Sequence, residues 1–339
     1  AFQWFLNRRT GKSKWWFVEI TVTIGLTVLL FRGGLQYKPI SVLTAARYTS
    51  NQNVAAVLNT TFTILKTLGK DELKNYDYDK KMPSALTYFN PMHNYANTGV
   101  FKRMNVVLII MESFSKEYIG YFNHGKGYTP FLDSLMQHSL TCTDAFANGK
   151  KSIEGIPCIV SGIPALMNTP YISGQYNSNN LSSLPFLLKK YGYSSSFYHG
   201  GNNGTMGFEN FSKMAGYDYY VGRNEYGDKD YDGTWGVYDE PFFQFFCHEL
   251  NTQKQPFVAT VFSLSSHHPY AIPPQYHSRF KDGEQPIHRA VRYADYALQQ
   301  YFECAKKQPW YYNTLFVITA DHTGPSIVSH YQTRTGIYE

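Results

Sequence analysis

Side chains that bind metals or transfer protons stand directly after four apolar runs of the 339-residue sequence. They are Glu112 and Ser113 after 105–111, His199 with two glycines after 194–198, Ser266, His267 and His268 after 257–264, and Asp321 and His322 after 314–319. Carboxylate and imidazole groups together are typical ligands of Mn²⁺, Zn²⁺ or Mg²⁺. Any one of these residues alone could be a capping group or a hydrogen-bonded loop residue. Their joint occurrence predicts a divalent metal site.

Ser152 is the candidate nucleophile, in the segment NGKKSIEGIPCIVSG at 148–162. Its hydroxyl could be activated by coordination to the metal, or by Lys150, Lys151 and a helix N-terminus that hold a phosphate group. Ser152 could also be an N-cap residue with Glu154 in the first helical turn, and the two roles are compatible. A Ser-His-Asp hydrolase is disfavoured because the sequence has no G-x-S-x-G elbow, and Gly-Lys-Lys-Ser lacks the spacing of a Walker loop.

The apolar runs are typical of strands buried on both faces of a sheet, because segments such as NVVLIIM and TLFVIT are continuous and rich in β-branched residues. Helices are expected at 129–137, 184–190 and 287–306. This alternation predicts an α/β sandwich with a mostly parallel central sheet. Ligands of such sheets bind at the carboxyl ends of the strands, so these elements would bring the polar residues together.

The N-terminal region is typical of a membrane anchor. Residues 15–31, WWFVEITVTIGLTVLLF, predict a transmembrane helix near the minimum length, although Glu19 would also suit a buried core helix. Basic residues in 1–14 predict a cytoplasmic flank, which puts everything after Arg32 outside. We expect a helical connector at 32–95 and a catalytic domain at 96–339. Because the chain starts at Ala1 rather than Met and ends soon after the Asp-His pair, we expect a segment of a longer protein.

Composition narrows the class of protein. With 43% hydrophobic and 17% charged residues, the chain is not intrinsically disordered. Aromatic residues make up 17%, which suits carbohydrate clefts, interfaces or the membrane headgroup layer. The net charge of +6 fits an anionic membrane or substrate better than nucleic acid, since Lys and Arg form no run longer than a pair. The 4 cysteines have no C-x-x-C spacing, which argues against a zinc ribbon and leaves disulfide pairing open.

Five segments resemble a known family in sequence order: NVVLIIMESF, NGKKSIEGIPCIVSG, YHGGNNGTMGFENF, SLSSHHPY and VITADHTG. They are similar to the signature segments of the lipoteichoic acid synthase and phosphoglycerol transferase family of the alkaline phosphatase/sulfatase superfamily. The resemblance covers 96–339, and RGGLQYKP at 32–39 looks like that family's segment just outside its last membrane helix. It implies an alkaline phosphatase/sulfatase-like α/β domain, Mn²⁺ or a similar divalent ion, and transfer of a phospholipid headgroup outside the cytoplasmic membrane.

The resemblance also implies roles for individual residues. By position, the metal ligands are Glu112, Ser152, Asp321 and His322, with Ser152 in the place of the family's Thr nucleophile. His267 matches the histidine that binds the substrate phosphate, and His199 matches a residue lining the donor pocket. Lys150 and Lys151 would help to neutralise nonbridging phosphate oxygens.

The chain departs from the family pattern in two places, and the second leaves the headgroup open. The nucleophile is Ser rather than Thr, and both present a hydroxyl. The Trp and Arg that hold glycerol phosphate in lipoteichoic acid synthases have no clear counterparts, because the chain reads GTMGFEN at 204–210. The stretch SIEGIPC at 152–158 is similar to the nucleophile segment of phosphoethanolamine transferases. Sulfatase activity is disfavoured since the formylglycine motif, Cys/Ser-x-Pro-x-Arg, is absent.

We therefore expect an enzyme of the cytoplasmic membrane, with its catalytic domain on the extracytoplasmic side. It would transfer a phosphoglycerol-type headgroup from an anionic or zwitterionic phospholipid to a glycan or glycolipid acceptor through a covalent phosphoseryl intermediate. The alternatives are a phosphoethanolamine transferase, a metal-dependent phosphodiesterase or sulfatase-like hydrolase, and a catalytically inactive binding module on a membrane anchor.

Overall fold

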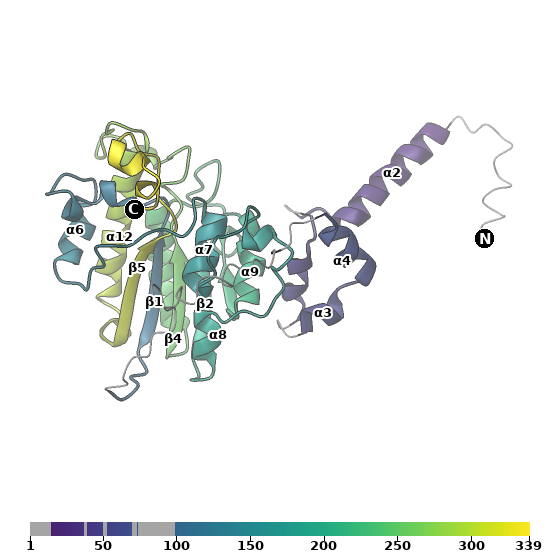
Figure 1. Cartoon of the computed structure of the whole chain (residues 1–339), viewed down its shortest axis with the longest axis horizontal. Helices are drawn as coiled ribbons and strands as arrows, with labels where there is room; N and C mark the ends of the chain where they lie inside the picture. Colours follow the sequence, from purple (N-terminus) through teal and green to yellow (C-terminus); the bar gives the residue numbers. More distant parts are fainter. Residues whose placement is uncertain (1–14, 37–38, 50–52, 70–72, 74–98) are drawn as a thin grey trace, which may run out of the picture.

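The fold is built around a parallel β-sheet. The computed structural model describes residues 15–36, 39–49, 53–69, 73 and 99–339. Five strands lie in the order β3-β2-β4-β1-β5, and every paired neighbour is parallel (Figure 1). The strands are β1 Asn105–Met111, β2 Ser194–His199, β3 Tyr219–Val221, β4 Phe257–Phe262 and β5 Thr314–Ala320. The predicted α/β class with a parallel central sheet is confirmed.

The register of the sheet places the ends of three strands side by side. Ile110 of β1 is opposite Phe262 of β4, and Met111 is opposite Ala320 of β5. The backbone N–H of Asp321 donates to the carbonyl of Met111 at 3.3 Å, which continues the ladder one residue past β5. The residues that follow β1, β4 and β5 therefore share one edge of the sheet, as expected for parallel strands.

Helices cover both faces of the sheet. Successive side chains of β1 point to opposite faces, so Val107 and Ile109 belong to one buried cluster and Leu108 and Ile110 to another. The first cluster includes residues of α6 Pro130–Met136, α11 Asp239–Glu249 and α12 Ile287–Ala305. The second includes residues of α7 Ser152–Ser161 and α9 Phe208–Met214, and α8 Leu184–Lys189 contacts β2 on the same side (Figure 1).

A disulfide joins the two long helices of the first layer. Cys247 of α11 is bonded to Cys304 of α12, across 57 residues of sequence, while Cys142 and Cys158 are free thiols. The two helices can lie against each other because α12 buries an apolar face with the three- and four-residue spacing of a helix, consisting of Ile287, Val291, Ala294, Leu298 and Tyr301. The pairing that the sequence left open is thus resolved in favour of Cys247 and Cys304.

The N-terminal helix, α2 Trp16–Arg32, occupies the segment for which the sequence predicted a membrane span, and Gly33 with a φ of 84° ends it. Its 17 residues correspond to about 26 Å, shorter than the roughly 30 Å hydrocarbon core of a bilayer. Among the described residues, no helix has both the length and the apolar character that crossing a membrane requires. The prediction of a transmembrane helix is therefore not confirmed, and no residue of α2 is buried in this chain.

The described part of the connector packs on the catalytic part of the chain. It contains the 3₁₀ helix η2 Val42–Arg47 and the helices α3 Val54–Val57 and α4 Thr60–Thr67. Leu43 and Val54 are buried in the same cluster as α9, and Arg47 donates to Glu209 at 2.6 Å and to Asn210 at 2.8 Å. The predicted flank at 1–14, the connector residues 74–95 and the boundary near residue 96 lie outside the described residues.

Candidate metal centre and active site

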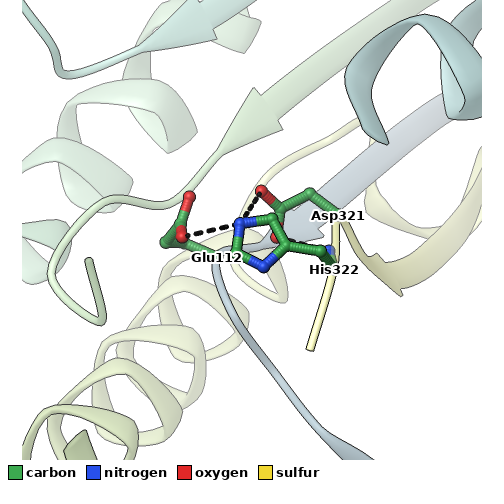
Figure 2. Close-up of side chains that lie close together, drawn as sticks. All are labelled: Glu112, Asp321 and His322. Carbon is green, nitrogen blue, oxygen red and sulfur yellow. Dashed lines mark hydrogen bonds and ion pairs between the residues drawn. The ribbon is translucent and has the colours of Figure 1, made fainter. Parts of the chain in front are cut away.

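Two carboxylates and one imidazole meet at the carboxyl edge of the sheet. Glu112 directly follows β1, and Asp321 and His322 directly follow β5. One ligand atom from each of the three lies within 4.8 Å of the others. In Figure 2 the His322 ring lies between the two carboxylates, with Nε2 at 3.4 Å from Glu112 Oε1 and 3.4 Å from Asp321 Oδ2. In the described part of the chain, these three form the group of His, Asp and Glu side chains that lie close enough together to share a metal ion.

The orientation of the His322 ring suits a metal ligand. Its Nδ1 lies 2.7 Å from the backbone carbonyl oxygen of Thr323. A carbonyl oxygen only accepts hydrogen bonds, so Nδ1 carries the proton in the neutral ring and Nε2 keeps its lone pair. A backbone carbonyl that fixes the tautomer in this way is the usual arrangement around metal-binding histidines.

Two buried carboxyl groups lie side by side in this centre, an arrangement that a bound cation would stabilise. Burial raises the pKa of Glu112, although hydrogen bonds from Ser113 and Ser152 oppose the rise. Burial, and secondarily the neighbouring Glu112, raises the pKa of Asp321 to about 8. Asp321 Oδ2 is also buried without a hydrogen-bond partner. An unpaired buried oxygen beside a second carboxylate is a costly arrangement that a divalent cation would relieve, so the residues present fit the metal that the sequence predicted.

Ser152 lies against this centre as the first residue of α7. Its Oγ donates to Glu112 Oε2 at 3.0 Å and lies 3.4 Å from His322 Nε2. The N-cap position belongs to Lys151, which has extended φ and ψ of −143° and 148°, so the alternative of Ser152 as an N-cap residue is wrong. The side chain of Ser152 is instead buried and directed into the metal centre.

Ser113 connects the two carboxylates that the sheet brings together. Its Oγ donates to Glu112 Oε1 at 2.6 Å, and its backbone N–H donates to Asp321 Oδ1 at 2.9 Å. Its φ of 56° is rare for a residue other than glycine, and such conformations persist where the surroundings demand them. The sequence identified Ser113 only as a polar residue after a strand, since a backbone conformation of this kind leaves no clear sequence signal.

On the other side of β1, two serines that follow β4 form hydrogen bonds with the backbone of Glu112. Ser263 Oγ accepts from the backbone N–H of Glu112 at 2.8 Å, and Ser266 Oγ donates to the Glu112 carbonyl at 2.5 Å. His267, the next residue, is partly exposed, and its Nδ1 lies 2.8 Å from the carbonyl oxygen of His268. Its Nε2 is thereby left for other contacts. The role of His267 in binding substrate phosphate stays a prediction.

The other predicted substrate residues lie in two different environments. His199, the last residue of β2, is buried between Phe262, whose ring centroid is 4.8 Å away, and Phe208 at 5.5 Å. Burial lowers the pKa of His199 to about 4. Lys150 and Lys151 are exposed, and the Lys150 ammonium lies 5.2 Å from the ring centroid of Tyr338. Among the described residues, no hydrogen bond or ion pair joins His199 or these ammonium groups to Ser152, so their roles stay predictions.

Sequence reasoning did not single out two residues that contact the predicted substrate-binding segments. The ring of Trp235 packs edge-on against His267 at 4.5 Å, and its Nε1 donates to the His268 carbonyl at 2.8 Å. The backbone N–H of Arg223 donates to the carbonyl of Gly201, directly after the His-Gly pair. Both residues follow the GTMGFEN segment by more than a dozen residues. An antiparallel bridge between Gly201 and Gly236 brings the segment around Trp235 next to the loop that follows β2. The glycine-rich segment DGTWG at 232–236 was the sequence signal that could have indicated a turn carrying Trp235.

Comparison with known proteins identifies related sequences. The sequence profile of the family described as Sulfatase matches residues 104–336. Lipoteichoic acid synthase 1 of Bacillus subtilis (strain 168) is 30% identical over 243 residues, which cover 67% of this chain and 37% of that protein. The chain spans between 36% and 43% of the length of the curated relatives that it matches.

Solved structures with the same fold are also found. A protein of the alkaline phosphatase superfamily from Vibrio parahaemolyticus has a TM-score of 0.63 and 28% identity, over 70% of this chain and 59% of that one. The lipoteichoic acid synthase LtaP from Listeria monocytogenes has a TM-score of 0.60 and 24% identity, over 68% and 58%. The similarity to the lipoteichoic acid synthases and to the superfamily that the sequence predicted is confirmed.

Proposed function

The chain belongs to the sulfatase family, and on that premise we propose that it is a metal-dependent phosphotransferase. It would move a phosphoglycerol-type headgroup from a phospholipid to a hydroxyl group of a glycan or glycolipid. One observation carries the proposal: the buried Ser152 hydroxyl lies 3.0 Å from Glu112 and 3.4 Å from His322, inside a group of metal-binding side chains. Similarity to lipoteichoic acid synthases supports a glycerol headgroup over ethanolamine.

Glu112, Asp321 and His322 would hold the divalent ion, with Ser152 next to them. When bound, the ion would lower the pKa of the Ser152 hydroxyl and polarise a phosphoryl oxygen. We propose Mn²⁺, because two carboxylates and one imidazole without a thiolate form a hard to borderline donor set. Zn²⁺ and Mg²⁺ are the other candidates for the same ligands.

The reaction would proceed in two displacements. Ser152 Oγ attacks the phosphorus, a bond forms between them, and the bond from phosphorus to the glycerol oxygen of diacylglycerol breaks. Glu112 Oε2 accepts the hydrogen bond of the Ser152 hydroxyl and would take its proton as the new bond forms. The departing oxygen receives one proton in exchange and leaves as diacylglycerol. An acceptor hydroxyl then attacks the same phosphorus and gives up its proton, while the phosphoserine ester breaks and the serine oxygen is protonated again. His267, with Lys150 and Lys151, would neutralise the nonbridging oxygens.

Location outside the cytoplasm is part of the proposal. The bond between Cys247 and Cys304 is typical of proteins that fold in oxidising compartments. The apolar side chains of α2 are exposed and would associate with the membrane in which a phospholipid donor resides. We therefore propose the extracytoplasmic face of the cytoplasmic membrane, where the net charge of +6 would favour anionic lipid.

The test is release of diacylglycerol from labelled phosphatidylglycerol and phosphatidylethanolamine in mixed micelles with Mn²⁺. We expect turnover of phosphatidylglycerol, its loss in Ser152→Ala, partial retention in Ser152→Thr, and parental rates in the control Ser139→Ala, whose hydroxyl is exposed. Full activity in Ser152→Ala would refute the proposed nucleophile. Turnover of phosphatidylethanolamine alone would assign the ethanolamine headgroup instead. Turnover of nitrophenyl phosphodiesters or sulfates, with no lipid turnover, would identify a hydrolase.

A further inference from the structure

A polar cavity lies beside the loop that follows β2. It has a volume of about 430 Å³ and is lined by Asn202, Arg223, Asn224, Gly227 and Asp228. The lining contains one guanidinium, one carboxylate and two side-chain amides, and no apolar side chain. None of these residues belongs to the metal centre, and the proposed function assigns no role to them.

Arg223 is held in a defined orientation but is incompletely satisfied by the protein. Its guanidinium stacks on the ring of Tyr231 at 3.6 Å and donates to Asn202 Oδ1 at 2.8 Å and to Asp228 Oδ1 at 2.8 Å. These bonds use two of its five N–H groups, and its Nε is buried without a hydrogen-bond partner. A stacked, planar guanidinium of this kind is prepared to bind oxygen atoms with little further loss of side-chain entropy.

The cavity is linked through the backbone to the predicted substrate side of the active site. Asn202 donates its backbone N–H to the carbonyl of Trp235 at 3.2 Å. The ring of Trp235 packs against His267, the residue predicted to bind the substrate phosphate. The segment that lines the cavity is therefore hydrogen-bonded to the residue whose ring packs against His267.

We propose that this cavity binds the neutral neighbouring hydroxyl groups of a polyol, which rests on the proposed function and deepens it. A hydroxyl group both donates and accepts hydrogen bonds, so it can pair with Arg223 and Asp228 at once. A second phosphate would meet the negative charge of Asp228, and an ammonium group would meet the positive charge of Arg223. The polyol could be the glycerol of the donor headgroup or a sugar of the acceptor, because both present the same chemistry.

Binding is tested without catalysis by saturation-transfer NMR with glycerol and methyl glucoside as probes and ethanolamine as the comparison. We expect transfer to both polyols and its loss in Asp228→Ala, which should leave the fold intact because this side chain is 91% exposed. Arg223→Ala should behave alike. The control is Arg279→Ala, which removes another arginine stacked on a tyrosine, at 4.0 Å from Tyr296. Equal transfer to parent and Asp228→Ala, or none to the parent, overturns the proposal.

Kinetics identify the source of the polyol. If the cavity holds the donor glycerol, Asp228→Ala and Arg223→Ala raise the KM for phosphatidylglycerol about tenfold, with kcat and metal content nearly unchanged. If it holds the acceptor, the same rise appears in the KM for an added glycan acceptor. Unchanged KM values for both in an active enzyme overturn the proposal. If the parent turns over no lipid, the proposed function fails, and the NMR result alone decides whether the cavity binds polyols.

Discussion

Gly155 of α7 lies so close to the backbone carbonyl of Asp321 that a Cβ atom at this position would overlap the carbonyl oxygen. The contact joins the helix that carries Ser152 to the strand end that carries Asp321 and His322. Only a residue without a side chain allows this approach. The distance of 3.4 Å between Ser152 Oγ and His322 Nε2 therefore depends on a glycine three residues along the helix.

Gly155→Ala should move Ser152, the proposed nucleophile, away from the proposed metal ligands Asp321 and His322. The added methyl group must push α7 or the end of β5 away, because its nearest neighbours are backbone atoms. A displacement of about 1 Å can cost on the order of 100-fold in rate, while overpacking costs about 1–3 kcal/mol of stability. The measurements are kcat for diacylglycerol release and the denaturation midpoint.

The matched control for this variant is Gly99→Ala, because a Cβ atom at Gly99 would meet nothing within 4 Å. It should leave both kcat and stability at the parental values. A Gly155→Ala enzyme with parental kcat would show that the close contact with Asp321 does not position Ser152.

Asp321→Asn should make the protein insensitive to added metal without weakening the metal-free fold. Burial and the nearby Glu112 raise the pKa of Asp321 to about 8, so its charge is unfavourable when no cation is bound. An amide keeps the acceptor for the N–H groups of Ser113 and His322 and can donate toward Glu112. A bound ion at 100 times its Kd should stabilise the parent by about 2.7 kcal/mol.

Thermal unfolding of chelator-treated protein, with and without Mn²⁺, checks this prediction, together with elemental analysis. The parent should show a rise in Tm and stoichiometric metal, and Asp321→Asn should show neither. A variant that still gains stability with Mn²⁺ would contradict the assignment of Asp321 as a ligand.

Because His199 is buried in its neutral form, the free energy of unfolding should decrease at acidic pH. Burial lowers its pKa to about 4, below the ordinary value of 6.5 that it regains on unfolding. Between these pH values the unfolded chain binds more protons than the folded chain. The contribution of neutral His199 to the free energy of unfolding is therefore complete above pH 6.5 and is lost as the pH falls toward 4. The contribution is at most on the order of 3 kcal/mol.

Denaturant unfolding between pH 4 and 7 measures the effect. His199→Asn removes the titrating ring. The slope of the unfolding free energy against pH should therefore be smaller than in the parent, by the equivalent of up to one proton taken up on unfolding. His248→Asn changes an exposed histidine and should keep the parental slope. An unchanged slope in His199→Asn would show that His199 is not held neutral.

Reduction of the disulfide should destabilise the fold without affecting the metal centre directly. A bond that closes a loop of 57 residues lowers the entropy of the unfolded chain by an amount worth about 4 kcal/mol. Unfolding with and without dithiothreitol should show this difference in the parent and not in the double variant Cys247→Ser/Cys304→Ser. Cys142→Ser removes an exposed free thiol and should respond like the parent. A reductant effect that survives in the double variant would contradict the role of this bond.

Long apolar runs made much of the fold predictable. The segment 105–111 has no polar residue after Asn105, so it could only be a strand buried on both faces, and it is β1. The same reasoning located β4 and β5 within two residues, and the helix predicted at 287–306 is α12, Ile287–Ala305. β3 was missed because three residues, Tyr219–Val221, carry no periodicity, and α11 was missed because its acidic start and aromatic run have little regular spacing.

The candidate site was predictable as a set of residues but not as an arrangement. Parallel strands place their carboxyl ends on one edge, so Glu112, Asp321 and His322 could be expected together. The positive φ of Ser113 and the contact of Gly155 depend on how two elements meet in space, which no local pattern encodes. Trp235 escaped notice for the same reason, because an antiparallel bridge distant from the motif brings it to His267.

β1 and β5, the first and last strands among the described residues, are neighbours in the sheet, which has a consequence for biosynthesis. Ser113 and Asp321 are separated by 208 residues, yet they are hydrogen-bonded across the β1 and β5 ends. A nascent chain that has exposed only its first four strands carries Glu112 and Ser152 without Asp321 or His322. The proposed metal site would therefore be complete only after β5 has been synthesised and has paired with β1, so an ion held by these residues would bind late in folding.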